Sequence, residues 1–148
     1  MGNNMELLAF TREALSASYL MSLGVSDEQG PWVADVIFVH DDECNIYWMS
    51  TPDRRHSIVI AVNSQVAAAM AATTGPDMPD LGVQMSGIAE MIGAVPREVV
   101  LRYFRKRNKP EPAADFVVLE EHQWYILRST RIELINESLF GYDRMRVR

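Results

Sequence analysis

Cysteine, early basic residues and long apolar runs are all scarce in this chain. The single cysteine, Cys44, has no second thiol to pair with, which excludes a disulfide within the chain and fits a reducing compartment. No apolar run approaches the roughly 20 residues that span a bilayer. The first residues, MGNNMELLAFTREAL, carry acids where a signal peptide has basic residues. We therefore expect a cytoplasmic protein with no membrane partner.

Basic residues are rare in the first part of the chain. Residues 1–93 carry three (Arg12, Arg54 and Arg55) against 12 acidic ones, whereas residues 94–148 carry 11 against 8, for a net charge of −6. General affinity for nucleic acid comes largely from neutralised phosphates, so a net acidic chain predicts no nucleic-acid partner. Arg54 and Arg55 are adjacent and His56 follows them, which makes this cluster the first candidate site.

The chain holds enough apolar sequence for one core. It has 148 residues, of which 48% are hydrophobic, the usual size of a single domain that folds without a metal or disulfide. We expect one domain over residues 1–148, made of an N-terminal helix (1–18), a barrel core (19–93) and a helix followed by C-terminal strands (94–148).

Apolar periodicity predicts short strands with helices at some of their junctions. The predicted helices cover residues 3–18, 54–62 and 96–107, and the predicted strands cover 19–25, 32–39, 46–50, 66–72, 82–93, 116–119, 124–127 and 131–135. Residues 32–39 are nearly all apolar and are expected to form a buried strand. Because regular strand–helix alternation is missing, we expect a mainly β (α+β) barrel of antiparallel strands.

Local signals refine some of these elements. Asn3 followed by Glu6 resembles a capping box at the start of the first helix. Thr51 and Pro52 predict the cap and first residue of the second helix. Gly87 interrupts a long apolar strand and predicts a bend or bulge there.

The segment around Arg54, Arg55 and His56 lies where a strand is followed by a helix. Free backbone N–H groups at a helix start favour anions, and arginine binds phosphate through two parallel hydrogen bonds. The alternative is a solvated, charged helix start in which Asp53 pairs with an arginine.

Three further features allow a binding or a structural interpretation. Gln84 lies within an apolar strand and could hydrogen-bond a planar heterocycle or simply face solvent. Asp35 shares a strand face with apolar residues, so that face opens to solvent or a cavity, or the carboxylate has a buried partner. A basic stripe follows helical spacing and is typical of a solvated face, with an anionic partner as the alternative: Arg102, Arg105, Lys106 and Lys109.

Common catalytic and metal motifs are missing from the sequence. His40, His56 and His122 are far apart, and no Cys/His pair has zinc-ligand spacing, so we expect no metal site. There is no phosphate-binding glycine loop, no dinucleotide fingerprint and no nucleophile elbow. No side chain is therefore nominated as a catalytic acid, base or nucleophile.

Taken in order, several segments resemble the pyridoxamine 5′-phosphate oxidase-like, FMN-binding split-barrel superfamily. The resemblance covers about residues 20–90 and implies a six- to seven-stranded antiparallel split β-barrel with two or three helices. Its parts are Pro31 before a strand, an Asp-rich hairpin, Ile46-Tyr47-Trp48-Met49-Ser50, Asp53-Arg54-Arg55-His56-Ser57 and Gly82-Val83-Gln84-Met85-Ser86-Gly87-Ile88-Ala89-Glu90. The later segment Asn136–Tyr142 resembles the ending of small bacterial members.

Site residues follow from this resemblance. Arg55 and His56 fall on the Arg-Lys pair that holds the FMN phosphate. Met49 and Ser50 fall on the strand that passes beside the flavin, and Gln84 falls on the glutamine near the isoalloxazine ring. The resemblance implies an FMN-binding, flavin-dependent oxidoreductase that acts on a small molecule. It also implies a homodimer with the cofactor at the subunit interface.

The chain departs from the oxidases at two phosphate-binding cations, which are replaced by Ala34 and Val39. The arginine- and tryptophan-containing substrate motif is also missing, so we do not expect pyridoxamine phosphate oxidase activity itself. Two alternatives keep the fold. One is a barrel that binds deazaflavin or haem, with His40, His56 or His122 as the haem ligand. The other is a non-enzymatic dimeric binding module that has lost the cofactor.

Overall fold

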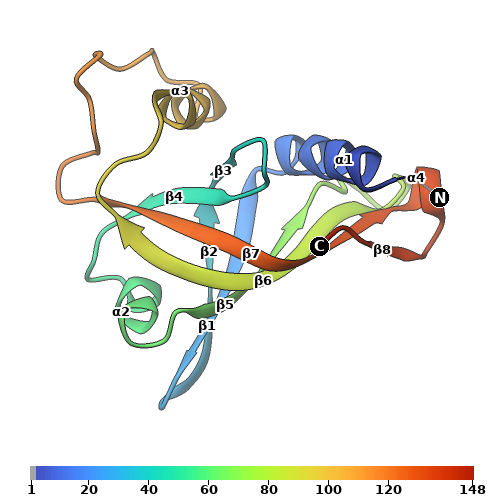
Figure 1. Cartoon of the computed structure of the whole chain (residues 1–148), viewed down its shortest axis with the longest axis horizontal. Coiled ribbons are helices and arrows are strands. Elements are labelled where there is room, and N and C mark those ends of the chain that lie inside the picture. The colour runs from blue at the N-terminus through green and yellow to red at the C-terminus, as the bar shows by residue number, and fades with distance from the viewer. Residues whose placement is uncertain (1–2) are drawn as a thin grey trace.

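A single antiparallel sheet, curled into a split barrel, forms the centre of the protein (Figure 1). The computed structural model describes residues 3–148, so residues 1–2 of the predicted N-terminal segment lie outside it. The strands are β1 (Leu20–Asp27), β2 (Gly30–Ile37), β3 (Val39–His40), β4 (Ile46–Ser50), β5 (Gln65–Ala71), β6 (Leu81–Ile92), β7 (Gln123–Asn136) and β8 (Arg144–Arg146). The helices are α1 (Asn4–Ala17), α2 (Arg55–Val62), α3 (Arg97–Lys106) and the single-turn α4 (Glu137–Phe140).

The order of strands in the sheet is β2-β1-β5-β6-β7-β4-β3, and the short β8 pairs with β7. The predicted fold class, a mainly β split barrel of six to seven antiparallel strands, is confirmed, with β8 as an addition. Within residues 3–148, β2 and β3 each pair with one strand only, which leaves the barrel open between them.

The inner face of the sheet carries the main core. Strand β5 alternates strictly, with Val66, Ala68 and Met70 buried and the alanines between them exposed. Helices α1 and α2 close this core, since Leu15 of α1 and Ile60 of α2 belong to the same buried cluster. The core therefore forms where two helices meet the concave side of a curled sheet.

A second, smaller core lies on the other face of β4 and β7. Helix α3 packs there and contributes Val99, Val100 and Tyr103. The strand residues that meet it are Tyr47, Met49, Trp124 and Ile126. The edge of the Tyr103 ring meets Trp124 at 5.4 Å between ring centroids. Alternation along β4 explains both cores, because Trp48 faces the main core while its two neighbours face α3.

Some predicted elements differ from the structure. Residues 116–119 are not a strand but an irregular segment packed on the second core, where the Val117 carbonyl accepts a hydrogen bond from Trp124 Nε1 at 2.6 Å. The predicted strands 124–127 and 131–135 are parts of the single strand β7. The expected hairpin between 116–119 and 124–127 is therefore wrong, because long β7 pairs with β6 and β4 instead.

The start of one helix and the burial of one strand also differ from the predictions. The capping box of Asn3 and Glu6 is confirmed. Helix α2 begins at Arg55 with Arg54 as its N-cap, so the predicted cap at Thr51 is wrong; the Thr51 hydroxyl donates to Asp53 instead. The predicted burial of residues 32–39 fails for most of β2, where Val33 is 63% exposed. No helix within residues 3–148 is both long and apolar enough to cross a membrane.

The predicted irregularity at Gly87 is confirmed. Register between β6 and β7 shifts between Ser86 and Gly87, where Thr130 is the extra residue on β7. A Cβ atom on Gly87 would overlap the Arg128 carbonyl oxygen and come within 2.7 Å of Ser129 Cα. The two backbones approach this closely only because residue 87 has no side chain.

We predict that Gly87→Ala lowers the free energy of unfolding by about 1–3 kcal/mol, because the added methyl group forces the β6–β7 ladder apart. Urea denaturation measures this change. The matched control is Gly24→Ala on β1, where the nearest atom to a new Cβ is an ordinary contact of 3.5 Å to the Ala67 carbonyl oxygen. Equal stability of the two variants would contradict the packing argument at Gly87.

Candidate functional site

The junction between β4 and α2 holds a buried polar pair. Ser50 Oγ and His56 Nε2 share a hydrogen bond of 3.0 Å, and both residues are more than nine-tenths buried. Burial lowers the pKa of His56, and the positive charge of Arg54 lowers it further. The imidazole is therefore neutral at neutral pH and fixes Ser50 at the end of its strand.

Two arginines flank this pair on the surface. The Arg55 guanidinium lies 4.2 Å from the ring centroid of Trp32 on β2, a cation–π contact that fixes the position of the charge. Arg54 is exposed and supplies no side-chain cap to the helix, so no side chain occupies the first backbone N–H groups of α2. An open helix start beside two cations fits an anionic group such as a phosphate.

Ser57, the next residue of α2, adds an unusual feature. Its Oγ is buried and has no hydrogen-bond partner among the residues that the structure describes. Buried hydroxyls are normally satisfied, so this donor is available to a ligand or water at the start of the helix.

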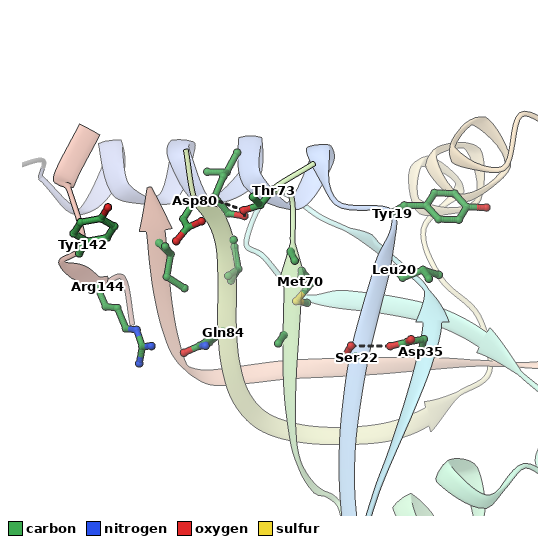
Figure 2. A pocket seen from close by; sticks show the side chains of 16 residues that line it. Tyr19, Leu20, Ser22, Asp35, Met70, Thr73, Asp80, Gln84, Tyr142 and Arg144 are labelled. Carbon is green, nitrogen blue, oxygen red and sulfur yellow. Dashed lines mark hydrogen bonds between the residues drawn. The ribbon is translucent and has the colours of Figure 1, made fainter. Parts of the chain in front are cut away.

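An open cavity of about 730 Å³ lies on the outer face of the sheet. The strand register aligns one residue from each of six strands across this face, in the order Asp35, Ser22, Ala69, Gln84, Glu133 and Arg146. Figure 2 shows the cavity between the side chains of β1 and β2 and those that reach it from β6 and β8. Ala69, a small exposed residue, lies in the middle of its floor.

Polar groups stand at both sides of this floor. The Asp35 carboxylate is exposed, lines the cavity and accepts a hydrogen bond of 2.7 Å from the Ser22 hydroxyl. Gln84 lies on the other side with Tyr142 and Arg144, and its amide makes no hydrogen bond within residues 3–148 (Figure 2). The side-chain amide is therefore free to bind a ligand that enters the cavity.

Of the five predicted site residues, Ser50 and His56 are in direct contact. Met49, however, faces the second core and is buried there. Trp124 on β7 pairs with Met49 on one side and with Ile92 of β6 on the other. Gln84 lies eight residues from Ile92, a length of roughly 26 Å along β6 at about 3.3 Å per residue.

Sequence reasoning missed three contributors to these sites: Trp32, Ser22 and Arg144. Trp32 lies in an apolar run that predicted burial, so nothing in the sequence indicated that its ring would face Arg55. Ser22 and Arg144 reach the cavity through strand pairing over long sequence separations, and local patterns carry no such signal.

The three histidines lie in different surroundings. His40 and His56 are buried and hydrogen-bonded. His122 is partly exposed, and its Nδ1–H donates to the Glu120 carbonyl at 2.8 Å, which leaves Nε2 free. Among residues 3–148, no three His, Cys, Asp or Glu side chains are grouped to hold a metal ion.

Comparison with known proteins extends the description of the fold. No known sequence family matches the chain, and no curated protein matches it by sequence. Solved structures do match. Conserved hypothetical protein Rv2991 from Mycobacterium tuberculosis has a TM-score of 0.71 at 13% identity, over 98% of this chain and 91% of that one.

Two further structures carry functional descriptions. A haem-binding protein from Mycobacterium smegmatis has a TM-score of 0.66 at 16% identity, over 99% of this chain but only 59% of its own. A candidate pyridoxamine 5′-phosphate oxidase from Listeria innocua has a TM-score of 0.63 at 16% identity, over 90% of this chain and 98% of its own. The chain therefore has the split-barrel fold of these proteins, as the resemblance predicted.

We predict that acid destabilises the protein through its buried imidazoles. Since folding lowers the pKa of His56 and His40 below the ordinary value of about 6.5, stability is fully present above that pH and falls as the pH drops below it. Urea unfolding at about pH 5 and about pH 7.5 measures the difference. The difference should shrink in His56→Gln, and an unchanged difference would contradict the assignment of His56.

Proposed function

We propose that the protein binds FMN as a homodimer and acts as a flavin-dependent oxidoreductase on a small molecule. The observation that carries this proposal is the open, doubly cationic start of α2 on a split-barrel fold. Arg54 and Arg55 flank N–H groups that no side chain caps, and the Trp32 ring fixes one of the guanidinium groups.

The phosphate group of FMN would be held by Arg55, Arg54 and the first N–H groups of α2. His56 takes a different part from the one that the resemblance suggests. A buried, neutral imidazole supplies no charge to a phosphate, so His56 positions Ser50 beside the ligand. The flavin would supply the redox chemistry, while the protein orients it and shields it from water.

A second copy of the chain would complete the site. Gln84 lies eight residues along β6 from the strand pair that holds Met49, and in the proposed dimer it would meet the flavin from the partner subunit. The outer face offers a surface for this pairing, with small residues at its centre. Large apolar side chains are exposed on the same sheet and on α2: Leu20, Trp32, Val33, Ile58, Val62, Ile88 and Met91. Exposed apolar side chains in such number are typical of an interface.

Pyridoxamine phosphate oxidation remains outside this proposal. Val39, at one of the oxidase cation positions, is buried in the second core, and Ala34 at the other is too short to reach a phosphate. Each missing charge-assisted hydrogen bond is worth about 1.5–3 kcal/mol. We therefore expect FMN to bind more weakly here than in those oxidases.

Haem is a second candidate because of His122. Hydrogen bonding of Nδ1 to a carbonyl group fixes the tautomer in which Nε2 can bind a metal, the usual arrangement of a ligating histidine. The haem-binding protein from Mycobacterium smegmatis has the same fold, although this chain spans 59% of its length. A Soret band on addition of haem, lost in His122→Ala, would favour this candidate over FMN.

We predict that FMN binds with a Kd in the micromolar range and that Arg55→Glu weakens it by roughly 10- to 100-fold, the loss of one charge-assisted hydrogen bond. Flavin fluorescence measures the titration. Lys109→Glu is the matched control, because Lys109 is an exposed cation that lines none of these cavities. Failure of FMN to bind the unmodified protein would sink the proposal and favour deazaflavin, haem or a module without cofactor.

We also predict that Ala69→Lys converts the dimer to a monomer, since it places a charge at the centre of the flat outer face. Analytical ultracentrifugation gives the mass of each species. Ala114→Lys, on an exposed loop, adds the same charge elsewhere and should leave the dimer intact. A monomeric unmodified protein would contradict the idea that two chains build the site.

A further inference from the structure

A second polar cavity, of about 590 Å³, lies between α1, β3 and α3. Four cationic side chains line it: Arg12 from α1 and Arg102, Arg105 and Lys106 from α3. Its remaining surface is largely apolar. The predicted basic stripe on α3 is therefore not simply a solvated face, because three of its four members turn toward this cavity.

Most of this positive charge has no counterion. Arg102 pairs with Asp42 at 3.1 Å and with Glu98 at 2.8 Å. Among the residues that the structure describes, Arg12, Arg105 and Lys106 form no ion pair. These three unpaired cations repel one another, so the cavity is suited to an anion that would relieve the repulsion.

Lys106 is a half-buried cation of this cavity. Its Nζ donates to the Phe38 carbonyl oxygen at 2.6 Å and lies 3.5 Å from the centroid of the Phe38 ring. Burial lowers the pKa of this ammonium group to about 8. A nearby anion would favour the charged form and offset that cost. Phe38 is itself fully buried, with the Lys106 ammonium group over its ring.

The wall opposite α3 is held rigidly. His40 Nδ1–H donates to the Asp41 carbonyl at 2.9 Å, so its Nε2 accepts from the Ser16 hydroxyl at 3.0 Å. The His40 carbonyl in turn accepts a hydrogen bond of 2.7 Å from Arg102. With α1, β3 and α3 tied together in this way, the cavity exists before any ligand enters.

This cavity is separate from the sites described above. It is lined from α1, β3 and α3, whereas the proposed phosphate site lies at α2, which packs against β1, β2 and β6. Figure 1 shows α1 and α3 above the strands and α2 below them. The cavity on the outer face shares no lining residue with it.

We propose that this cavity binds a small organic anion: a carboxylate or phosphate held by Arg105 and Lys106, on an apolar body that packs against the apolar part of the lining. A volume of about 590 Å³ and a concave shape suit a small molecule, since ligand pockets usually enclose about 300–1,000 Å³. The cationic rim selects the charge, and the apolar floor selects a ligand larger than a bare ion.

Calorimetric titration of the full chain with phenyl phosphate and with benzoate tests the proposal. We expect at least one of them to bind at least tenfold more tightly than two control compounds. Inorganic phosphate has the negative charge without the apolar body, and benzyl alcohol has the apolar body without the charge. Arg105→Gln should weaken that binding at least tenfold. Because Arg105 is exposed and makes no ion pair within residues 3–148, the variant should fold normally.

Lys109→Gln is the matched control. Lys109 follows the end of α3 and does not line the cavity, so this variant removes one cation from outside it. An equal loss in this control would mean diffuse attraction to a basic surface and would overturn the proposal, as would no binding of either probe at millimolar concentration. Arg55→Glu should leave the binding unchanged. This keeps the result independent of whether FMN binds at α2.

Discussion

The close contact between β6 and β7 at Gly87 is the constraint on which the rest of the structure depends. These two long strands run the length of the barrel and carry residues of both cores. One extra residue on β7, Thr130, shifts the alternation there. As a result, Tyr125 and Leu127 before the bulge and Ile132 and Leu134 after it all face the main core. Without it, half of β7 would turn its apolar side chains outward.

The same shift explains how far sequence reasoning could go. Alternation breaks at residues 128–130, and a pattern with period two reads such a break as a gap between strands. The glycine opposite the break was recognisable, because only glycine permits that approach. The partner strand was not, since pairing of β6 with β7 is decided by long-range contacts. Burial of β2 was overestimated because one sequence cannot show which apolar residues remain uncovered by its own fold.

The candidate site was predictable in its pieces and not in its assembly. The strand-to-helix junction and its cations follow from local sequence, and Ser50 and His56 do meet. Adjacent residues on a strand face opposite sides, however, so Met49 could not share a surface with Ser50. The charge of His56 depends on burial, which the motif did not contain. The basic stripe on α3 gained its meaning only when α1 and β3 came to face it.

The row of side chains across the outer face has a polarity of its own. It begins with the carboxylate of Asp35 on β2, crosses Ala69 near its middle, and ends with the guanidinium of Arg146 on β8. A two-fold axis parallel to the strands and midway between Ala69 and Gln84 would reverse this order in a second copy and set Asp35 against the other copy's Arg146. In that arrangement the two ends of the row would be complementary in charge, whereas two rows running in the same direction would set like charges together.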